Sequence, residues 1–180
     1  MKKIEMLKFE IFTEEKMIYH TSKYNKDALF NYSQILELKY GKSLIEYWGN
    51  SKHIYIVAYE DKKLAGVLKI KLEGQNSLLN PGFCNWVDFI SVHPDYQNMG
   101  ISKKLIEMGF MWLKDNNYDH ILISGYSSLG FHFVMNYFKK IAESMGLRFS
   151  HEEKIGFPDM DKDGKYIWED EKHKLLAMEN

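Results

Sequence analysis

The chain has 180 residues, the size of one domain, and its 45% of apolar residues suffice to bury a core without disulfides or metals. Its formal net charge of -1 provides no basic field that would attract DNA or RNA, so we expect no nucleic-acid partner. The single cysteine, Cys84, excludes an intramolecular disulfide and favours a reducing cytoplasmic compartment.

Charged residues interrupt the N-terminal segment of the chain. Glu5, Lys8 and Glu10 stand where a signal peptide needs an unbroken apolar stretch, so we predict none. The longest apolar run, Ile54 to Tyr59, is much shorter than the ~20 residues that a membrane-spanning helix needs. We therefore expect a soluble, cytoplasmic protein with no membrane partner.

In the first half of the chain, apolar spacing predicts three strands and one helix. Alternation of apolar and charged residues predicts strands over residues 5–12 and 64–73, and β-branched and aromatic residues predict a strand over 53–60. A helical period predicts a helix over residues 24–40. The second and third strands flank a short polar turn and form an antiparallel hairpin. A stretch rich in Asn, Gly and Ser over residues 74–82 predicts a loop.

The second half alternates strands and helices. Strands are predicted over 85–93, 119–124, 147–157 and 172–178, and helices from Ile101 through Leu113 and over 129–145. The strand, helix and strand over 85–124 form a parallel unit with a right-handed crossover. We therefore predict one domain over residues 1–180 of the α/β (α+β) class, with a single mixed, mostly antiparallel central sheet flanked by helices.

One segment carries the clearest chemistry. Residues 92–104 read V-H-P-D-Y-Q-N-M-G-I-S-K-K and join the strand over 85–93 to the following helix. Free backbone N–H groups gather at a helix N-terminus, and small residues such as Gly100 and Ser102 let an anion approach them closely. The segment therefore predicts a diphosphate site. The alternative is a polar turn that merely precedes an amphipathic helix.

The string Gln97-x-x-Gly100-x-Ser102, after a strand that ends in Val92-His93-Pro94, resembles the central motif of the GNAT family of N-acetyltransferases. This resemblance implies the acyl-CoA N-acyltransferase fold, acetyl-CoA as cosubstrate, and a pair of parallel strands that splay to admit it. It also implies cofactor-binding roles, for the pantetheine arm at the strand end and for the pyrophosphate in the loop, at Ile90, Ser91, Val92, Gln97, Asn98, Met99, Gly100, Ile101, Ser102 and Lys103.

Three positions depart from the family pattern. Ser102 stands where the family has Gly or Ala, which adds a hydroxyl but leaves the N–H groups open. Ala142 occupies the place of the family's usual general acid, counted back from Gly146. Trp86 falls at the family's frequent base position and cannot accept a proton.

Acetylation of an amine requires a group that accepts a proton and can use one that protonates the departing thiolate. Our candidate base is Asp88, a carboxylate inside an apolar strand that we place on the same face as Trp86, Ile90 and Val92. A purely structural ion pair with a nearby Lys is the alternative reading. Our candidate acid is Tyr137, with Tyr126 as second choice.

The histidines show no metal-ligand spacing, so we predict no transition-metal site, and we assign His93 a surface or capping role. The sequence Asp159-x-Asp161-x-Asp163-Gly164 matches half of a calcium-binding loop, although a hairpin turn is the favoured reading. From Glu152 to Glu171 there are eight carboxylates and three lysines, which form a solvated loop or attract a cationic amine.

These patterns lead us to expect an N-acetyltransferase that moves an acetyl group from acetyl-CoA to a primary amine of a small molecule or peptide by direct attack. Another acyl donor or an oxygen acceptor is a rival within the same enzyme class. A non-catalytic CoA-binding or regulatory module is the alternative from another class, and a calcium-responsive protein is a third. An exposed edge strand near the C-terminus would permit a homodimer.

Overall fold

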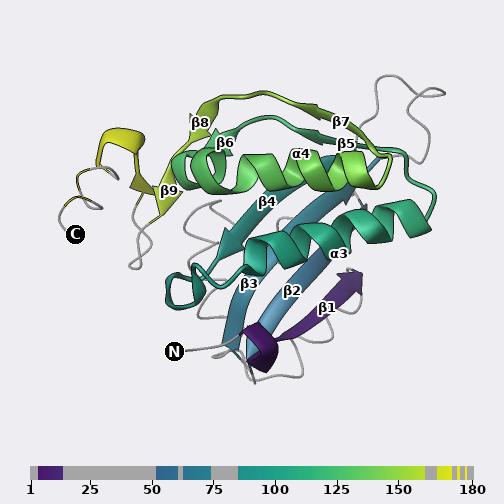
Figure 1. Cartoon of the computed structure of the whole chain (residues 1–180), viewed down its shortest axis with the longest axis horizontal. Coiled ribbons are helices and arrows are strands. Elements are labelled where there is room, and N and C mark those ends of the chain that lie inside the picture. The colour runs from purple at the N-terminus through teal and green to yellow at the C-terminus, as the bar shows by residue number, and fades with distance from the viewer. Residues whose placement is uncertain are drawn as a thin grey trace.

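A six-stranded sheet organises the molecule (Figure 1). The computed structural model describes residues 4–13, 52–60, 63–73, 85–160, 166–171, 174 and 177. The predicted helix over 24–40 and the predicted loop over 74–82 lie outside these residues. In spatial order the strands are β1 (Lys8–Thr13), β2 (Lys52–Glu60), β3 (Lys63–Leu72), β4 (Trp86–Val92), β5 (His120–Ile123) and β7 (Arg148–His151).

The sheet is mixed, as predicted. The first four strands pair antiparallel, and β4, β5 and β7 pair parallel. The predicted hairpin is confirmed as β2 and β3. The first strand begins later than expected, because a short 3-10 helix, η1 (Ile4–Met6), precedes it.

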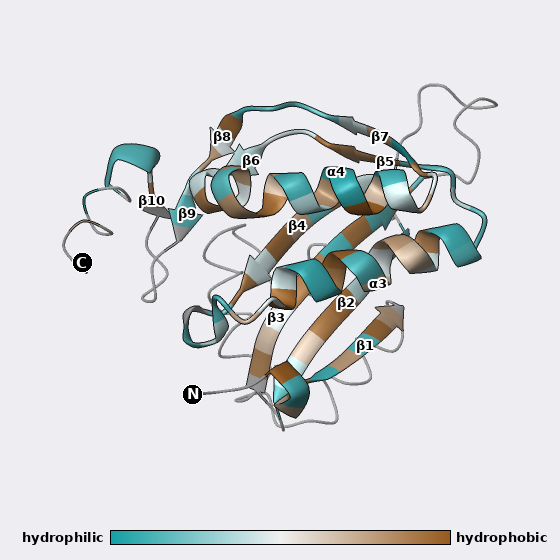
Figure 2. Ribbon diagram, in the orientation of Figure 1, coloured by the Kyte–Doolittle hydropathy of each residue, from teal (hydrophilic) through white to brown (hydrophobic). Residues whose placement is uncertain are grey.

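Helices α3 (Ile101–Asp115) and α4 (Met135–Ser144) lie side by side on one face of this sheet (Figure 1). Gly109 allows α3 to approach closely, because a Cβ at this position would lie 3.0 Å from Leu68 Cδ2 and 3.1 Å from Ile56 Cδ1. Strands β2 and β3 are largely hydrophobic, whereas hydrophilic residues recur along both helices (Figure 2). One hydrophobic core cluster therefore lies between the sheet and these two helices. Tyr55, Val57 and Val67 are also buried, on the other face of the sheet.

Strands β4 and β5 separate along their length, as the family resemblance implied. Their only ladder pair is Trp86 with Leu122, at the start of β4. Beyond it β4 continues beside β3 to Val92, while the chain after β5 turns into β6 (Tyr126–Ser127). The gap between the two strands therefore opens toward the C-terminal end of β4, where α3 begins.

The helix before α4 is irregular. A stretch of π-helix, η4 (Gly130–Val134), leads directly into α4, so the predicted helix over 129–145 is confirmed with a distorted first half. Gly146, at a φ of 69°, ends it as expected. Within the described residues, no helix has the length and apolar character needed to span a membrane.

Two predictions about the C-terminal region are wrong. The strand predicted over 147–157 is interrupted at Glu152–Lys154, where the chain turns, and β8 (Ile155–Phe157) pairs with β6 in a separate two-stranded sheet. The strand predicted over 172–178 is contradicted because residues 169–171, 174 and 177 are helical. The acidic residues at 169–171 favour the N-terminal end of a helix, because the helix dipole is positive there. The alternation of apolar and polar residues does not include this electrostatic effect.

The predicted hairpin around the acidic turn is confirmed. Strands β9 (Asp159–Met160) and β10 (Tyr166–Ile167) pair antiparallel in a third small sheet. The single predicted sheet is therefore accompanied by two short ribbons, one of which contains Asp159.

Candidate cofactor and catalytic site

The loop between β4 and α3 has an unusual backbone. After a turn of 3-10 helix, η3 (Pro94–Tyr96), Asn98 adopts a φ of 61° and Gly100 a φ of 80°. Asn tolerates this left-handed region better than most residues, and Gly adopts it without steric cost. The two residue types therefore fit the two special positions, and the chain turns sharply into α3.

The N-terminus of α3 carries no side-chain cap. Its N-cap residue, Gly100, has no side chain that could cap the helix. The Lys104 N–H donates to the Gly100 carbonyl at 3.2 Å. Ile101, Ser102 and Lys103 lie before Lys104 in the first turn of α3. Backbone N–H groups in the first turn have no carbonyl within the helix to bind. Among the residues that the structure describes, a Cβ on Gly100 would meet only Ile4 Cδ1, at 3.9 Å, so these residues leave space beside the loop. This arrangement fits a bound diphosphate.

Buried contacts fix the loop to the sheet. The Tyr96 hydroxyl donates to Glu60 Oε2 at 2.7 Å, and the His93 N–H donates to the Ala65 carbonyl at 2.8 Å. Tyr96 is 1% exposed. The Asp95 N–H donates to His93 Nδ1 at 3.1 Å, which agrees with the predicted capping role of His93. The loop is therefore held from two elements before any ligand binds.

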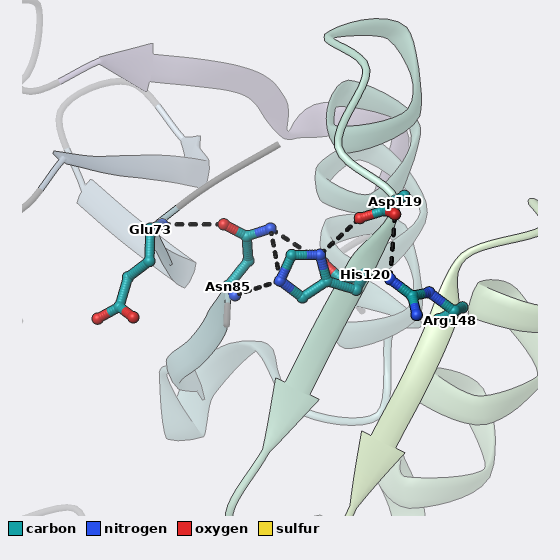
Figure 3. Close-up of polar contacts among 5 residues, drawn as sticks. All are labelled: Glu73, Asn85, Asp119, His120 and Arg148. Carbon is teal, nitrogen blue, oxygen red and sulfur yellow. Dashed lines mark hydrogen bonds and ion pairs between the residues drawn. The ribbon is translucent and has the colours of Figure 1, made fainter. Parts of the chain in front are cut away.

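At the closed end of the gap, a polar network joins the starts of the parallel strands (Figure 3). Asn85 precedes β4 and is 0% exposed. Its backbone N–H donates to His120 Nε2 at 3.2 Å, its Nδ2 donates to the His120 carbonyl at 3.2 Å, and its Oδ1 accepts from the Glu73 N–H at 2.9 Å. The side chain thus ties the end of β3 to β5.

The same network continues to β7 (Figure 3). Since His120 Nε2 accepts a hydrogen bond, its Nδ1 carries the proton and donates to Asp119 Oδ1 at 2.7 Å. Arg148 Nη2 donates to Asp119 Oδ2 at 3.1 Å. No local pattern in the sequence marks Asn85, His120 or Arg148, because the contacts that join these strands connect residues far apart in the chain. They hold β4 and β5 together where the gap begins.

Asp88 lies in a β-bulge of β4. Val87 pairs with Ile70 and Phe89 with Lys69, so Asp88 is the extra residue. The bulge reverses the alternation, and the predicted common face of Asp88 with Ile90 and Val92 is wrong. Ile90 and Val92 pack toward the α3 side of the sheet.

The Asp88 side chain forms an ion pair with a buried lysine. Lys69 Nζ lies 2.9 Å from Asp88 Oδ2, on the face of the sheet opposite α3. Lys69 is 0% exposed, whereas the Asp88 side chain is 22% exposed. The structural reading of Asp88, as the partner of a nearby Lys, is thus observed, and the residue still reaches solvent.

Tyr137 lies near the start of α3. It is exposed on α4, and its ring centroid is 5.9 Å from Lys103 Nζ. No hydrogen bond or ion pair joins Tyr137 to Asp88 in the described part of the chain. The predicted acid therefore stands beside the predicted pyrophosphate residues, and the predicted base stands at the bulge.

Tyr126, the second candidate acid, is buried beneath α4. Its hydroxyl lies 2.9 Å from His151 Nδ1, and His151 Nε2 lies 3.3 Å from Glu153 Oε1. Burial raises the pKa of the Tyr126 hydroxyl well above its usual range, and the charge of Glu153 adds to this effect. Because its hydroxyl is engaged with His151 under α4, Tyr126 is the weaker choice for an acid in the gap beside β4.

Asp159 caps the helix that leads into α4. Its Oδ2 accepts a hydrogen bond from the Leu129 N–H at 3.0 Å, and the residue is 6% exposed. Among the described residues, no group of His, Cys, Asp and Glu side chains is arranged to hold a metal ion. The residue that would begin a calcium loop thus has a structural role at a helix N-terminus.

Comparison with known proteins matches residues 13–132 to the family described as acetyltransferase (GNAT) family. This range includes the β4–α3 loop, the bulge and the Asn85–His120 contact. A search of curated proteins gives no match.

Among solved structures, an aminoglycoside acetyltransferase from an uncultured soil metagenomic sample is 17% identical at a TM-score of 0.43, over 78% of this chain and 88% of that one. The ribosomal-protein-alanine N-acetyltransferase from Brucella melitensis biovar Abortus 2308 is 18% identical at a TM-score of 0.45, over 77% and 89%. AAC(6')-Iy with a CoA bisubstrate analog is 13% identical at a TM-score of 0.42, over 86% and 98%. The ligands and acceptors in these descriptions belong to those proteins.

Proposed function

This chain belongs to the GNAT acetyltransferase family, and we propose that it is an N-acetyltransferase that moves an acetyl group from acetyl-CoA to a primary amine by direct attack. The observation that carries the proposal is the open, uncapped start of α3 after the left-handed Asn98 and Gly100. We further propose that the protein works in the cytoplasm on a small molecule or a peptide.

The β4–α3 loop supports the binding of acetyl-CoA, which supplies an acetyl group activated as a thioester. The N–H groups from Gln97 through Lys103 surround the positive end of the α3 dipole, which stabilises a pyrophosphate. The end of β4, at Ile90, Ser91 and Val92, borders the gap left by β5 and offers backbone groups to the pantetheine arm. Lys103 adds a positive charge on the same turn.

The bulge supports a role for Asp88 at the acceptor. An amine attacks only as the free base, so an incoming ammonium must give up a proton, directly or through water. Asp88 is a partly exposed carboxylate near the point where β4 and β5 part. In our proposal it receives that ammonium, while the Tyr137 hydroxyl donates a proton to the departing sulfur.

Acidic side chains in the last thirty residues of the chain support a cationic acceptor. Glu152 and Glu153 are exposed beyond β7, where Glu152 also pairs with Lys154, and Asp170 and Glu171 are exposed in the C-terminal helical segment. Such a concentration of negative charge raises the local concentration of polyamines, aminoglycosides and basic peptides. We therefore propose amines of this class as the first acceptors to test.

A non-catalytic CoA-binding module is the second candidate. Trp86 and Ala142 favour it, because they stand where the family often has its base and acid. Release of free thiol from acetyl-CoA, measured against pooled polyamines, amino acids, aminoglycosides and peptides, separates the two functions. Acceptor-dependent release supports the enzyme, whereas CoA binding without release from any pool supports the binding module.

The role of Tyr137 is tested by Tyr137→Phe, which keeps the ring beside Lys103 and removes the hydroxyl. We expect kcat to fall about 100-fold with little change in CoA affinity, because general acids commonly contribute about 100-fold or more. Tyr126→Phe serves as the matched control and should keep kcat within about threefold. Equal kcat in Tyr137→Phe and wild type would remove Tyr137 from the reaction.

A further inference from the structure

Lys69 is a fully buried lysine on the face of the sheet opposite α3. Its Nζ lies 5.8 Å from the ring centroid of Tyr55 and 5.8 Å from that of Phe89. Asp88 Oδ2 lies 2.9 Å from the same ammonium. A buried charge is costly unless it is paired, and the ion pair with the Asp88 carboxylate offsets part of this cost.

Packing alone does not require an ammonium at this position. Val67 lies on the same strand and face, and Val57 is on the neighbouring strand; both are 0% exposed. An apolar side chain at position 69 would extend this core without any desolvation of charge. The ion pair with Asp88 is therefore one reason for a lysine at this position.

The atoms of the Asp88 side chain differ in their exposure to solvent. Its Oδ2 and Lys69 Nζ are both closed to solvent. The 22% exposure of the Asp88 side chain therefore falls on its other atoms, of which Oδ1 is the polar one. Oδ2 is therefore held inside the protein beside Lys69, and the exposed part of the side chain lies on its remaining atoms.

The bulge places the Asp88 carboxylate close to the point where β4 and β5 separate. The only ladder contact between β4 and β5 is at Trp86, two residues before Asp88. The register shift between Lys69 and Ile70 turns Asp88 toward Lys69. A bulge next to a site commonly re-aims one side chain in this way.

We propose that Lys69 is a positioning residue, which anchors Asp88 through Oδ2 so that Oδ1 binds the ammonium of the acceptor and accepts its proton. This inference rests on the proposed function and deepens it. It assigns the binding of the acceptor's amine to a carboxylate held by a lysine that itself touches no substrate. Loss of Lys69 would leave Asp88 in place but free to rotate.

The experiment compares Lys69→Met with Lys71→Met, Lys69→Arg and Asp88→Asn. Lys71 is the matched control, because it lies on the same strand and face but is 35% exposed and pairs with Glu73 at 2.9 Å. Wild-type turnover and CoA affinity are measured first. Absence of turnover with every amine pool would overturn the proposed function and this inference with it.

With turnover established, Lys69→Met should lower kcat/KM for the acceptor at least about tenfold and leave the CoA dissociation constant within about twofold. Lys69→Arg should recover part of the loss, and Lys71→Met should resemble wild type. Lys69→Met combined with Asp88→Asn should be no worse than Asp88→Asn alone, because both changes act on one group.

Two results would overturn the inference while the proposed function stands. One is a folded Lys69→Met with wild-type kcat/KM, and the other is a pair of losses that multiply in the double variant. If the lone carboxylate prevents Lys69→Met from folding, Lys69→Gln, which keeps a hydrogen-bond donor, takes its place with the same expectations. The double variant removes both charges and provides a second folded reference.

Discussion

The backbone N–H of Asn85 donates a hydrogen bond to His120 Nε2 at 3.2 Å, and this contact joins β4 to β5 immediately before the strands part. The Asn85 amide also binds the His120 carbonyl and the Glu73 N–H. Three elements are thus fixed by one buried side chain. The width of the gap depends on this junction, because the strands share no ladder pair beyond Trp86.

Asn85→Ala should destabilise the protein by about 2–3 kcal/mol, because it removes the side-chain hydrogen bonds to the Glu73 N–H and the His120 carbonyl and leaves buried groups without partners. Asn116→Ala is the matched control. Asn116 is exposed at the end of α3, where its Nδ2 donates to the Trp112 carbonyl at 2.9 Å, and its loss should cost about 0.5 kcal/mol. Urea unfolding measures both, and equal effects would contradict the role assigned to the network.

The buried Tyr126 hydroxyl should make the free energy of unfolding fall at alkaline pH. Burial raises its pKa in the folded state, so the unfolded chain releases this proton first as the pH climbs. The stabilisation is complete below the ordinary tyrosine pKa of about 10 and declines above it, by up to about 1.4 kcal/mol per pH unit. Tyr126→Phe should therefore flatten the fall in unfolding free energy between about pH 9 and about pH 11. Parallel pH profiles for the two proteins would contradict this account.

Asp159 should matter as a helix cap and not as a calcium ligand. Asp159→Ala should cost about 1–2 kcal/mol, since it frees the Leu129 N–H at the start of the helix. The control Asp170→Ala changes an exposed carboxylate and should stay within about 0.5 kcal/mol of wild type. The wild-type melting temperature should not change in millimolar calcium, and a clear rise would restore the calcium loop.

Periodicity predicted most of the sheet and both described helices, because their apolar faces are long and regular. Periodicity could not predict the bulge at Asp88, because one extra residue in a mostly apolar strand does not change the local pattern of residue types. For the same reason the sequence placed Asp88 with Ile90 and Val92. The alternation of β3 also makes Lys69 look like a solvent-facing residue, whereas the tertiary structure buries it beside Asp88.

The candidate site could be predicted from the sequence only where its residues are close together in the chain. Gly100 and Ser102 identify the start of α3 because a loop followed by a helix is a short-range pattern. The support from Glu60 to Tyr96 joins residues 36 positions apart, and the Asn85–His120 contact joins residues 35 apart. Long-range pairs of polar residues follow from the fold, which no local spacing encodes. The C-terminal helical segment was missed because tertiary context overrides short patterns.

The central claim is that the β4–α3 loop binds the pyrophosphate of acetyl-CoA, and calorimetry of CoA binding tests it most directly. Gly100→Glu places a negative side chain in the open space beside Asn98 and the α3 N-terminus. Gly146→Glu is the matched control, because Gly146 also has a positive φ, of 69°, but lies beyond the far end of α4, where a Cβ would be 3.5 Å from Lys114 Nζ.

Both variants bear a similar backbone strain, so a difference between them reports the site. We predict that Gly100→Glu weakens CoA binding at least about 30-fold through charge repulsion and lost space, while Gly146→Glu stays within about threefold of wild type. Wild-type affinity in a folded Gly100→Glu, or no measurable CoA binding by the wild-type protein, would contradict the assignment of this loop.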